Sequence, residues 1–426
     1  MNFIIRKISL SLPRFIKRPL LRFYENYYAF RAAKSIGLQI NKKVNRPKNN
    51  KPRVLFYDIG AMGHGGTSKH LQILAKYLNK EKYDIYFMYS SKMPSGKYVL
   101  ICGKSNPIGR LFYFNQTPVH LIDFDYDSVD NKHPFIIRGM EPSIFDVIKE
   151  NNIDLLITTG AGYAYFPFNL VRNIPIIMLN VFGSYFLQKN ILYNICYTQE
   201  LVNKTREISD IEKIRIMPVP CERPTPKSKE GGRFLRKRLG IGESDVVFGR
   251  IGRDVDCIFD PIGIKAFQKI VKEYPSAHYL IMSPPPILRK IVEKEKIPNV
   301  HFLPPTGKEE EVWAFHQAND VLAHFRRDGE TFGLNIAEAM ICGKPIISHR
   351  SFMWNGHLEY LDKSFSRVAE IDNVEQYAGY MRDFIEFKKS GKIREMGEAA
   401  KEKAEKLFLI DNLINHFEKW VDKALK

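Results

Sequence analysis

Two carboxylates eight residues apart lie in the segment best suited to chemistry, residues 328–348, which read DGETFGLNIAEAMICGKPIIS. Glu330 falls in a loop after an apolar strand, and Glu338 falls in the second turn of a helix that begins near Gly333. The first N–H groups of a helix have no partner within it, and the helix dipole adds positive potential there. Here those groups belong to Thr331, Gly333 and Leu334.

A helix terminus of this kind suits an anion such as a diphosphate. A diphosphate held there would place Glu330 beside the hydroxyls of a sugar and Glu338 beside the hydroxyls of a ribose. The alternative is an ordinary strand–loop–helix connection that carries two surface acids. The two acids alone do not separate these interpretations.

Short apolar runs alternate with helix-period segments on both sides of this motif. A strand is predicted over 53–58, followed by a glycine-rich turn over 60–66 and a helix with apolar residues at helical spacing, Leu71, Leu74, Ala75 and Leu78. Further strands are predicted over 83–89, 154–158, 175–179, 214–219, 245–251, 278–282, 299–303, 320–324 and 344–348. Because such alternation forms parallel sheets, we expect an α/β chain with two doubly wound, Rossmann-like domains facing each other across a cleft.

Prolines separate the two predicted domains. Pro218, Pro220, Pro224 and Pro226, followed by Gly231-Gly232, favour neither a helix nor a central strand and predict a linker over 221–232. We therefore expect an acceptor-side domain over 51–220 and a nucleotide-sugar (donor) domain over 233–405. A basic extension over 1–50 and a helix over 406–426 complete the predicted organisation.

The acidic motif resembles a known family signature. Glu330, Phe332-Gly333, Glu338-Ala339-Met340 and Gly343-x-Pro345 resemble the E-x7-E signature of glycosyltransferase family 4, whose members have the GT-B fold. The resemblance extends over roughly residues 53–420. Gly63, Gly65 and Gly66 resemble the glycine loop of that family, and residues 248–253 (FGRIGR) resemble the segment that carries its phosphate-binding arginine.

The resemblance implies a retaining glycosyltransferase that takes a nucleotide-sugar donor and needs neither a cofactor nor a metal. It implies catalytic roles for Glu330 and Arg253. The implied donor-binding residues are Glu338, Thr331, Phe332, Gly333, Leu334, Gly65, Gly66 and Arg250, with His64 and Lys69 as further candidates. The acceptor would be a glycan or a lipid-linked molecule, as in the synthesis of surface polysaccharides or glycolipids.

Two departures from the family pattern keep other functions open. The lysine expected a few residues after Arg253 is absent, so that Lys69, Arg250 or Lys265 would have to replace it, and residues 154–162 (DLLITTGAG) lack the expected histidine. The alternatives are a nucleotide-sugar epimerase of the same fold and a catalytically weak GT-B binding subunit. Asp123-Phe124-Asp125 offers a third alternative, the D-x-D metal clamp of other glycosyltransferases.

Composition and charge indicate a globular protein and argue against binding to nucleic acid. The chain is 44% hydrophobic and 26% charged, as in globular proteins, with a net charge of +18. Residues 1–50 hold twelve basic residues and one acid, hence +11, which leaves +7 for the other 376 residues. Because the charge is concentrated outside the folded core, nucleic acid is not an expected partner.

Residues 1–50 also interleave apolar side chains with the basic ones, a pattern that predicts attachment to an anionic membrane surface. The alternatives are a disordered basic tail and a helix packed on the folded domain. No stretch has the length of a transmembrane helix, and basic residues interrupt any secretory signal. The five cysteines form no C-x-x-C pair, so we expect a cytoplasmic protein, peripheral on the cytoplasmic membrane.

Overall fold

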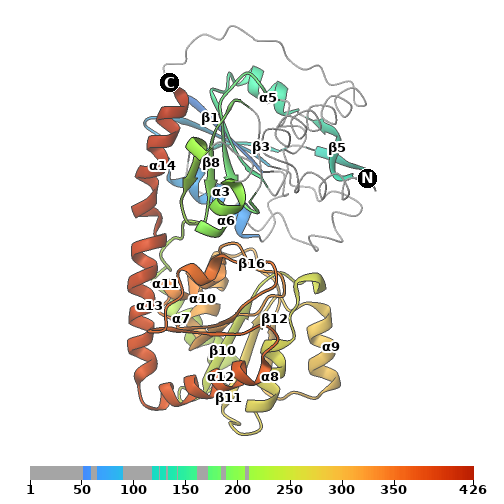
Figure 1. The fold of residues 1–426 in the computed structure, drawn as a ribbon, viewed down its shortest axis with the longest axis vertical. Helices are drawn as coiled ribbons and strands as arrows, with labels where there is room; N and C mark the ends of the chain where they lie inside the picture. Colours follow the sequence, from blue (N-terminus) through green and yellow to red (C-terminus); the bar gives the residue numbers. More distant parts are fainter. Residues whose placement is uncertain are drawn as a thin grey trace.

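The computed structural model describes residues 51–58, 65–89, 118–123, 125–130, 133–141, 143–160, 171–183, 189–206 and 211–426, and only the backbone of 123–141. Two α/β domains are stacked along the long axis of the molecule (Figure 1). The prediction of two doubly wound domains is confirmed. Residues 1–50 lie outside the described part of the chain.

The N-terminal domain is built on a parallel seven-stranded sheet of order β3-β2-β1-β6-β7-β8-β9. Its strands are β1 (Arg53–Asp58), β2 (Asp84–Tyr89), β3 (His120–Asp123), β6 (Leu155–Gly160), β7 (Ile176–Asn180), β8 (Ile191–Cys196) and β9 (Ile214–Ile216). The described helices are α3 (Gly66–Tyr77), α5 (Ile144–Glu150) and α6 (Gln199–Arg206), and β4 (Asp125–Asp130) pairs antiparallel with β5 (His133–Glu141). The central strands β6 and β7 are largely apolar because they are buried on both faces of the sheet.

The C-terminal domain repeats the same strand order in a six-stranded sheet, β12-β11-β10-β13-β15-β17. Its strands are β10 (Val246–Ile251), β11 (Ala277–Met282), β12 (Val300–Leu303), β13 (Val321–Ala323), β15 (Ile346–His349) and β17 (Ser366–Ala369). Its helices are α7 (Lys227–Arg238), α8 (Ile262–Ile270), α9 (Pro286–Lys294), α10 (Glu309–Ala318), α11 (Leu334–Ile341) and α12 (Val374–Lys389). Strand order reverses between β10 and β13, as it does between β1 and β6, and such switch points are where open parallel sheets bind ligands.

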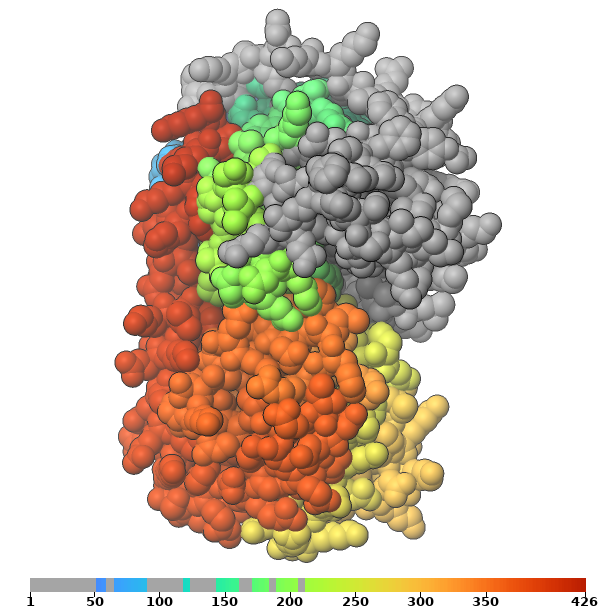
Figure 2. Space-filling model, viewed as in Figure 1, coloured from blue at the N-terminus to red at the C-terminus, as the bar shows by residue number. Residues whose placement is uncertain are grey.

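Two C-terminal helices join the domains along one side of the molecule (Figures 1 and 2). Helix α13 (Lys392–Phe408) packs on α11, and α14 (Ile410–Leu425) crosses back onto α3 of the N-terminal domain. Asp422 of α14 accepts hydrogen bonds from Lys82 Nζ (2.5 Å) and Tyr83 Oη (2.6 Å). The final helix is therefore a structural part of the N-terminal domain, although it follows the C-terminal domain in sequence.

The linker predicted over 221–232 is wrong in its second half, because α7 begins at Lys227 and contains both glycines. A Cβ atom on Gly231 would lie 2.9 Å from Cβ of Ala314, and one on Gly232 would lie 2.7 Å from Cβ of Gln317. These two glycines allow close packing of α7 on α10, and they do not mark a flexible connection. The extended part of the crossing ends near Pro226.

The described part of the chain contains no helix that is both long and apolar enough to span a bilayer. Its cysteines, Cys196, Cys221, Cys257 and Cys342, are free, and Cys102 lies outside the described residues.

Candidate functional site

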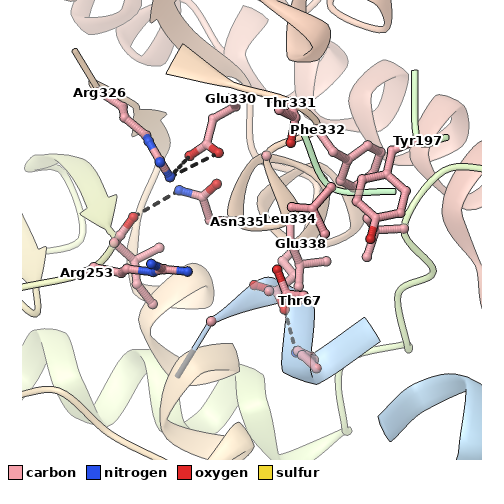
Figure 3. Close-up of a pocket in the computed structure, with 18 of the residues that line it drawn as sticks. Thr67, Tyr197, Arg253, Arg326, Glu330, Thr331, Phe332, Leu334, Asn335 and Glu338 are labelled. Carbon is pink, nitrogen blue, oxygen red and sulfur yellow. Dashed lines mark hydrogen bonds and ion pairs between the residues drawn. The ribbon is translucent and has the colours of Figure 1, made fainter. Parts of the chain in front are cut away.

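A cavity of about 200 Å³ lies between the two domains. The residues around it follow the carboxyl ends of strands in both sheets. The N-terminal domain contributes Gly65, Gly66, Thr67, Lys69, Val181, Phe182, Tyr197 and Val219, and the C-terminal domain contributes Arg253, Ser283, Thr306, Arg326, Glu330, the start of α11 and Glu338. Figure 3 shows the side chains from both domains directed into this space.

The loop that carries Glu330 is fixed by a two-residue strand. β14 (Gly329–Glu330) pairs in parallel with β16 (Trp354–Asn355). Gly329 has a φ of +73°, and a Cβ atom there would lie 1.8 Å from the carbonyl oxygen of Trp354. Only glycine fits this position. The backbone conformation of Gly329 therefore sets the direction of the Glu330 side chain.

Glu330 is mostly buried, with its side chain 16% exposed, and lies beside an arginine and a histidine. Its Oε2 lies 3.3 Å from Nη1 of Arg326, and its Oε1 lies 3.7 Å from Nε2 of His324 (Figure 3 shows the arginine contact). Arg326 is held in turn by Asp328, through contacts of 2.6 and 2.9 Å. Burial raises the pKa of Glu330, although Arg326 and the more distant Arg253 act in the opposite direction. The carboxylate is thus poorly solvated and directed toward the cavity.

The turn between Glu330 and α11 is held by hydrogen bonds from both domains. Gly333 is the N-cap of α11 with a φ of +84°. The Tyr360 hydroxyl donates to the carbonyl of Phe332 and to that of Gly333, the latter at 3.2 Å. Thr198 of the N-terminal domain donates to the carbonyl of Thr331 at 3.1 Å. These contacts hold the N-terminus of α11 against the cavity, where its dipole favours an anion.

Arg253 follows β10 and lines the same cavity (Figure 3). Within the described residues it forms no ion pair, and a Cβ atom on Gly65 would lie 3.1 Å from its Nη2. Asn335 of α11 donates to the carbonyl of Ile251 at 2.9 Å, which joins the end of β10 to the start of the helix. A guanidinium in this position is available to an anionic ligand.

Glu338 lies at the other side of the cavity in a different environment. Its Oε1 accepts a hydrogen bond from Nζ of Lys69 at 2.5 Å, and its Oε2 lies 3.6 Å from Nε2 of His316. Burial alone would raise the pKa of Glu338, but Lys69 and His316 outweigh it and lower the pKa to about 2. This carboxylate is therefore held in its ionised form.

Most of the predicted site residues lie together around the cavity. They are Glu330, Arg253, Glu338, Thr331, Phe332, Gly333, Leu334, Gly65, Gly66 and Lys69. His64 lies outside the described residues. Arg250, which was predicted to bind the donor, is buried and is not among the residues that line the cavity; its guanidinium lies 5.0 Å from the ring of Phe325. Burial lowers the pKa of Arg250 to about 10.

Three residues were candidates to replace the missing lysine, and only Lys69 lines the cavity. Lys265 is exposed and away from the cavity, and Arg250 is buried behind it. Lys69 lines the cavity, but its ammonium group already contacts two carboxylates. Arg326 is the second arginine that lines the cavity, and it was not predicted from the sequence. Its position three residues after β13 and four before Glu330 is the signal that could have found it.

Other lining residues had no sequence signal. Tyr197 and Phe182 of the N-terminal domain line the cavity only because the C-terminal domain packs against them. The side chains of Asp123 and Asp125 lie outside the described residues. Among the side chains that the structure describes, no group of three or more His, Cys, Asp or Glu residues is arranged to hold a metal ion.

Comparison with known proteins agrees with this geometry. Residues 262–405, which contain the Glu330 loop and α11, match the family model described as "Glycosyl transferases group 1". No curated protein matches the chain by sequence.

Several solved structures share the whole two-domain arrangement. A glycosyltransferase from Rickettsia africae is 13% identical with a TM-score of 0.65, covering 89% of this chain and all of its own. Alr3699/HepE from Anabaena, solved with UDP and glucose, is 15% identical with a TM-score of 0.63, covering 87% of this chain and 99% of its own. Sucrose-phosphate synthase from Thermosynechococcus elongatus is 14% identical with a TM-score of 0.64, covering 88% and 99%. The chain has the GT-B fold, and residues 262–405 of its C-terminal domain resemble group 1 glycosyltransferases.

Proposed function

We propose that this protein is a retaining glycosyltransferase that moves a sugar from a nucleotide-sugar donor to a hydroxyl group of a glycan or lipid-linked acceptor. The observation that carries the proposal is the arrangement of Arg253, the N-terminus of α11 and Glu330 around one interdomain cavity. Arg253 and the helix terminus suit a diphosphate, and Glu330 suits the hydroxyls of the attached sugar. UDP and glucose are bound in the Anabaena structure of the same fold, which supports a donor of this class.

The chemistry follows from the charges at the site. When the bond between the anomeric carbon and the diphosphate oxygen breaks, the electron pair leaves with the diphosphate. Arg253 and the dipole of α11 stabilise that negative charge. The acceptor oxygen bonds to the same face of the anomeric carbon, and its proton passes to an oxygen of the departing diphosphate. Glu330, oriented by Arg326, positions the sugar and stabilises the positive charge that develops on it.

The cellular setting is part of the same proposal. The enzyme acts without a metal or cofactor at the cytoplasmic membrane, in the synthesis of surface polysaccharide or glycolipid, with residues 1–50 on the anionic lipid surface. Co-sedimentation of full-length protein with anionic and neutral liposomes at low and high salt tests this attachment. Equal binding to both kinds of vesicle would contradict it.

The test of the activity is a screen of nucleoside diphosphate sugars. Binding is followed by thermal shift, because a ligand that binds the folded state raises its stability, and turnover is followed by release of nucleoside diphosphate with and without acceptor. We expect one donor to raise the melting temperature and to be consumed, with EDTA having no effect. Free epimer formed without acceptor would indicate an epimerase, and donor binding without any turnover would indicate a binding subunit.

A further inference from the structure

Lys69 is a buried cation that forms ion pairs with two carboxylates of the other domain. It lies in the first turn of α3 in the N-terminal domain, and its side chain is 3% exposed. Its Nζ lies 2.5 Å from Oε1 of Glu338 and 2.7 Å from Oε2 of Glu309, which belong to α11 and α10 of the C-terminal domain. The ring of Trp313, also in the C-terminal domain, lies 5.3 Å away.

This arrangement makes Lys69 sensitive to the relative position of the domains. A buried ammonium group is costly unless carboxylates or other acceptors pair with it. If the domains separate, Lys69 loses the contacts with Glu338 and Glu309, and Glu338 loses its short hydrogen bond. Contact between the domains thus forms the ion pair between Lys69 and Glu338.

The same contact orients a residue of the candidate donor site. Glu338 lines the cavity, where one of its oxygens accepts from Lys69 and the other lies near His316. A carboxylate has about four acceptor positions, so these contacts fix its rotamer and leave acceptor capacity for ligand hydroxyls. The start of α3 lies against the start of α11, since a Cβ atom on Gly66 would be in ordinary contact with Leu334, at 3.4 Å.

We propose that Lys69 is a positioning residue that makes the donor site complete only when the two domains are in contact. The inference rests on the proposed function, because it concerns Glu338 as a ligand-binding residue. Apparent affinity falls in proportion to the fraction of molecules that are competent to bind. Nucleotide affinity should therefore depend on a residue of the acceptor-side domain that need not touch the nucleotide.

The test compares Lys69→Met with Lys76→Met in the full-length protein. Lys76 lies on the same helix and also forms an ion pair, with Glu222 at 2.6 Å, but it does not line the cavity. The radius of gyration is measured by small-angle X-ray scattering without ligand, and the affinities for uridine, guanosine and adenosine diphosphates are measured by calorimetry. For Lys69→Met we expect a larger radius of gyration and an affinity lower by about tenfold or more. For Lys76→Met we expect both values to equal those of the wild type.

Two further variants separate positioning from a general structural role. In a Glu338→Gln background, Lys69→Met should lower the affinity no further, because the residue through which it acts is already changed. Lys69→Arg keeps the charge, and should retain the wild-type radius of gyration and restore most of the affinity even if Lys69→Met does not fold. An equal loss of affinity with and without the Glu338 carboxylate would overturn the inference, as would a Lys69→Met protein that matches the wild type in both measurements.

Failure of the proposed function and failure of the role of Lys69 give different experimental results. If the wild type binds none of the three nucleotides, the proposed function is contradicted. The radius of gyration of Lys69→Met still tests whether Lys69 holds the domains together. If the wild type binds a nucleotide and Lys69→Met does not change its affinity, the proposed function stands and the role of Lys69 is refuted.

Discussion

The two carboxylates of the acidic motif are eight residues apart but lie in opposite electrostatic environments. Glu330, in a loop, is mostly buried with its pKa raised, and its nearest cation is Arg326 of the same domain. Glu338, in a helix, is buried with its pKa lowered to about 2, and its nearest cation comes from the other domain. The same residue type thus serves two purposes, because burial disfavours the charge at one position and a short contact with an ammonium group secures it at the other.

Substitutions near Glu330 and substitutions near Glu338 should therefore have different effects on the protein. The region of Arg253 and Glu330 is built from the loops of one domain, so changes there should mainly alter chemistry. The region of Glu338 spans both domains, so changes there should alter ligand affinity and stability together.

The largest effect is expected for Arg253→Ala. Because Arg253 has no carboxylate partner among the described residues, its charge is available to a diphosphate. We expect kcat/KM to fall by about 100- to 1000-fold, as measured by steady-state assays with the donor found in the screen. Arg289→Ala, which removes an exposed arginine of α9, is the matched control and should have no effect. Wild-type kcat/KM in Arg253→Ala would place the diphosphate elsewhere.

Glu330→Gln should lower kcat by about one to two decades, the value of one charge-assisted hydrogen bond. The fold should be retained, since the amide keeps the shape and removes a charge that burial opposes. For the same reason its melting temperature at pH 7 should equal or exceed that of the wild type. Circular dichroism and kinetics on the same sample check both points, and wild-type turnover by a folded variant would remove Glu330 from the mechanism.

Glu338→Gln should change donor KM more than kcat and should change the response to acid. The folded-state pKa of Glu338 lies below its ordinary value of 4.5. Its contribution to stability is therefore present above about pH 4.5 and lost as the pH falls toward 2. The melting temperature of the wild type should fall more steeply between pH 5 and pH 3 than that of Glu338→Gln. Glu386→Gln, an exposed acid of α12, serves as the control and should follow the wild type; parallel curves for Glu338→Gln would contradict the assignment.

The smallest effect is expected at the glycines that precede and begin α3. In Gly65→Ala the new Cβ atom would lie 3.1 Å from Nη2 of Arg253, tighter than ordinary contact, so the guanidinium must shift. In Gly66→Ala it would lie 3.4 Å from Leu334, an ordinary contact. We expect kcat/KM to fall by several-fold, roughly 1 kcal/mol, in Gly65→Ala and to stay unchanged in Gly66→Ala. Equal effects of the two substitutions, measured under the same conditions, would show that the distance to Arg253 is not the cause.

The sequence by itself determined most strands of the two sheets and the acidic motif, but it did not predict β3, β8 or β17. Strands such as β1 and β2 are apolar runs bounded by polar residues, a local pattern that the fold retains because both faces of a parallel sheet are buried. The loop position of Glu330 and the helical position of Glu338 follow from the same local rules, because Gly333 and Gly343 mark the ends of α11.

Tertiary structure alone decided what surrounds those residues. Gly231-Gly232 predicts a linker when read locally, but a neighbouring helix makes it a packing site. Arg250 and Arg253 are three residues apart, and the strand directs one into the core and the other to the cavity. The contact between Lys69 and Glu338 joins residues 269 positions apart in the chain. No sequence period records such a contact, because it arises only when two separately folded sheets bring their carboxyl edges together.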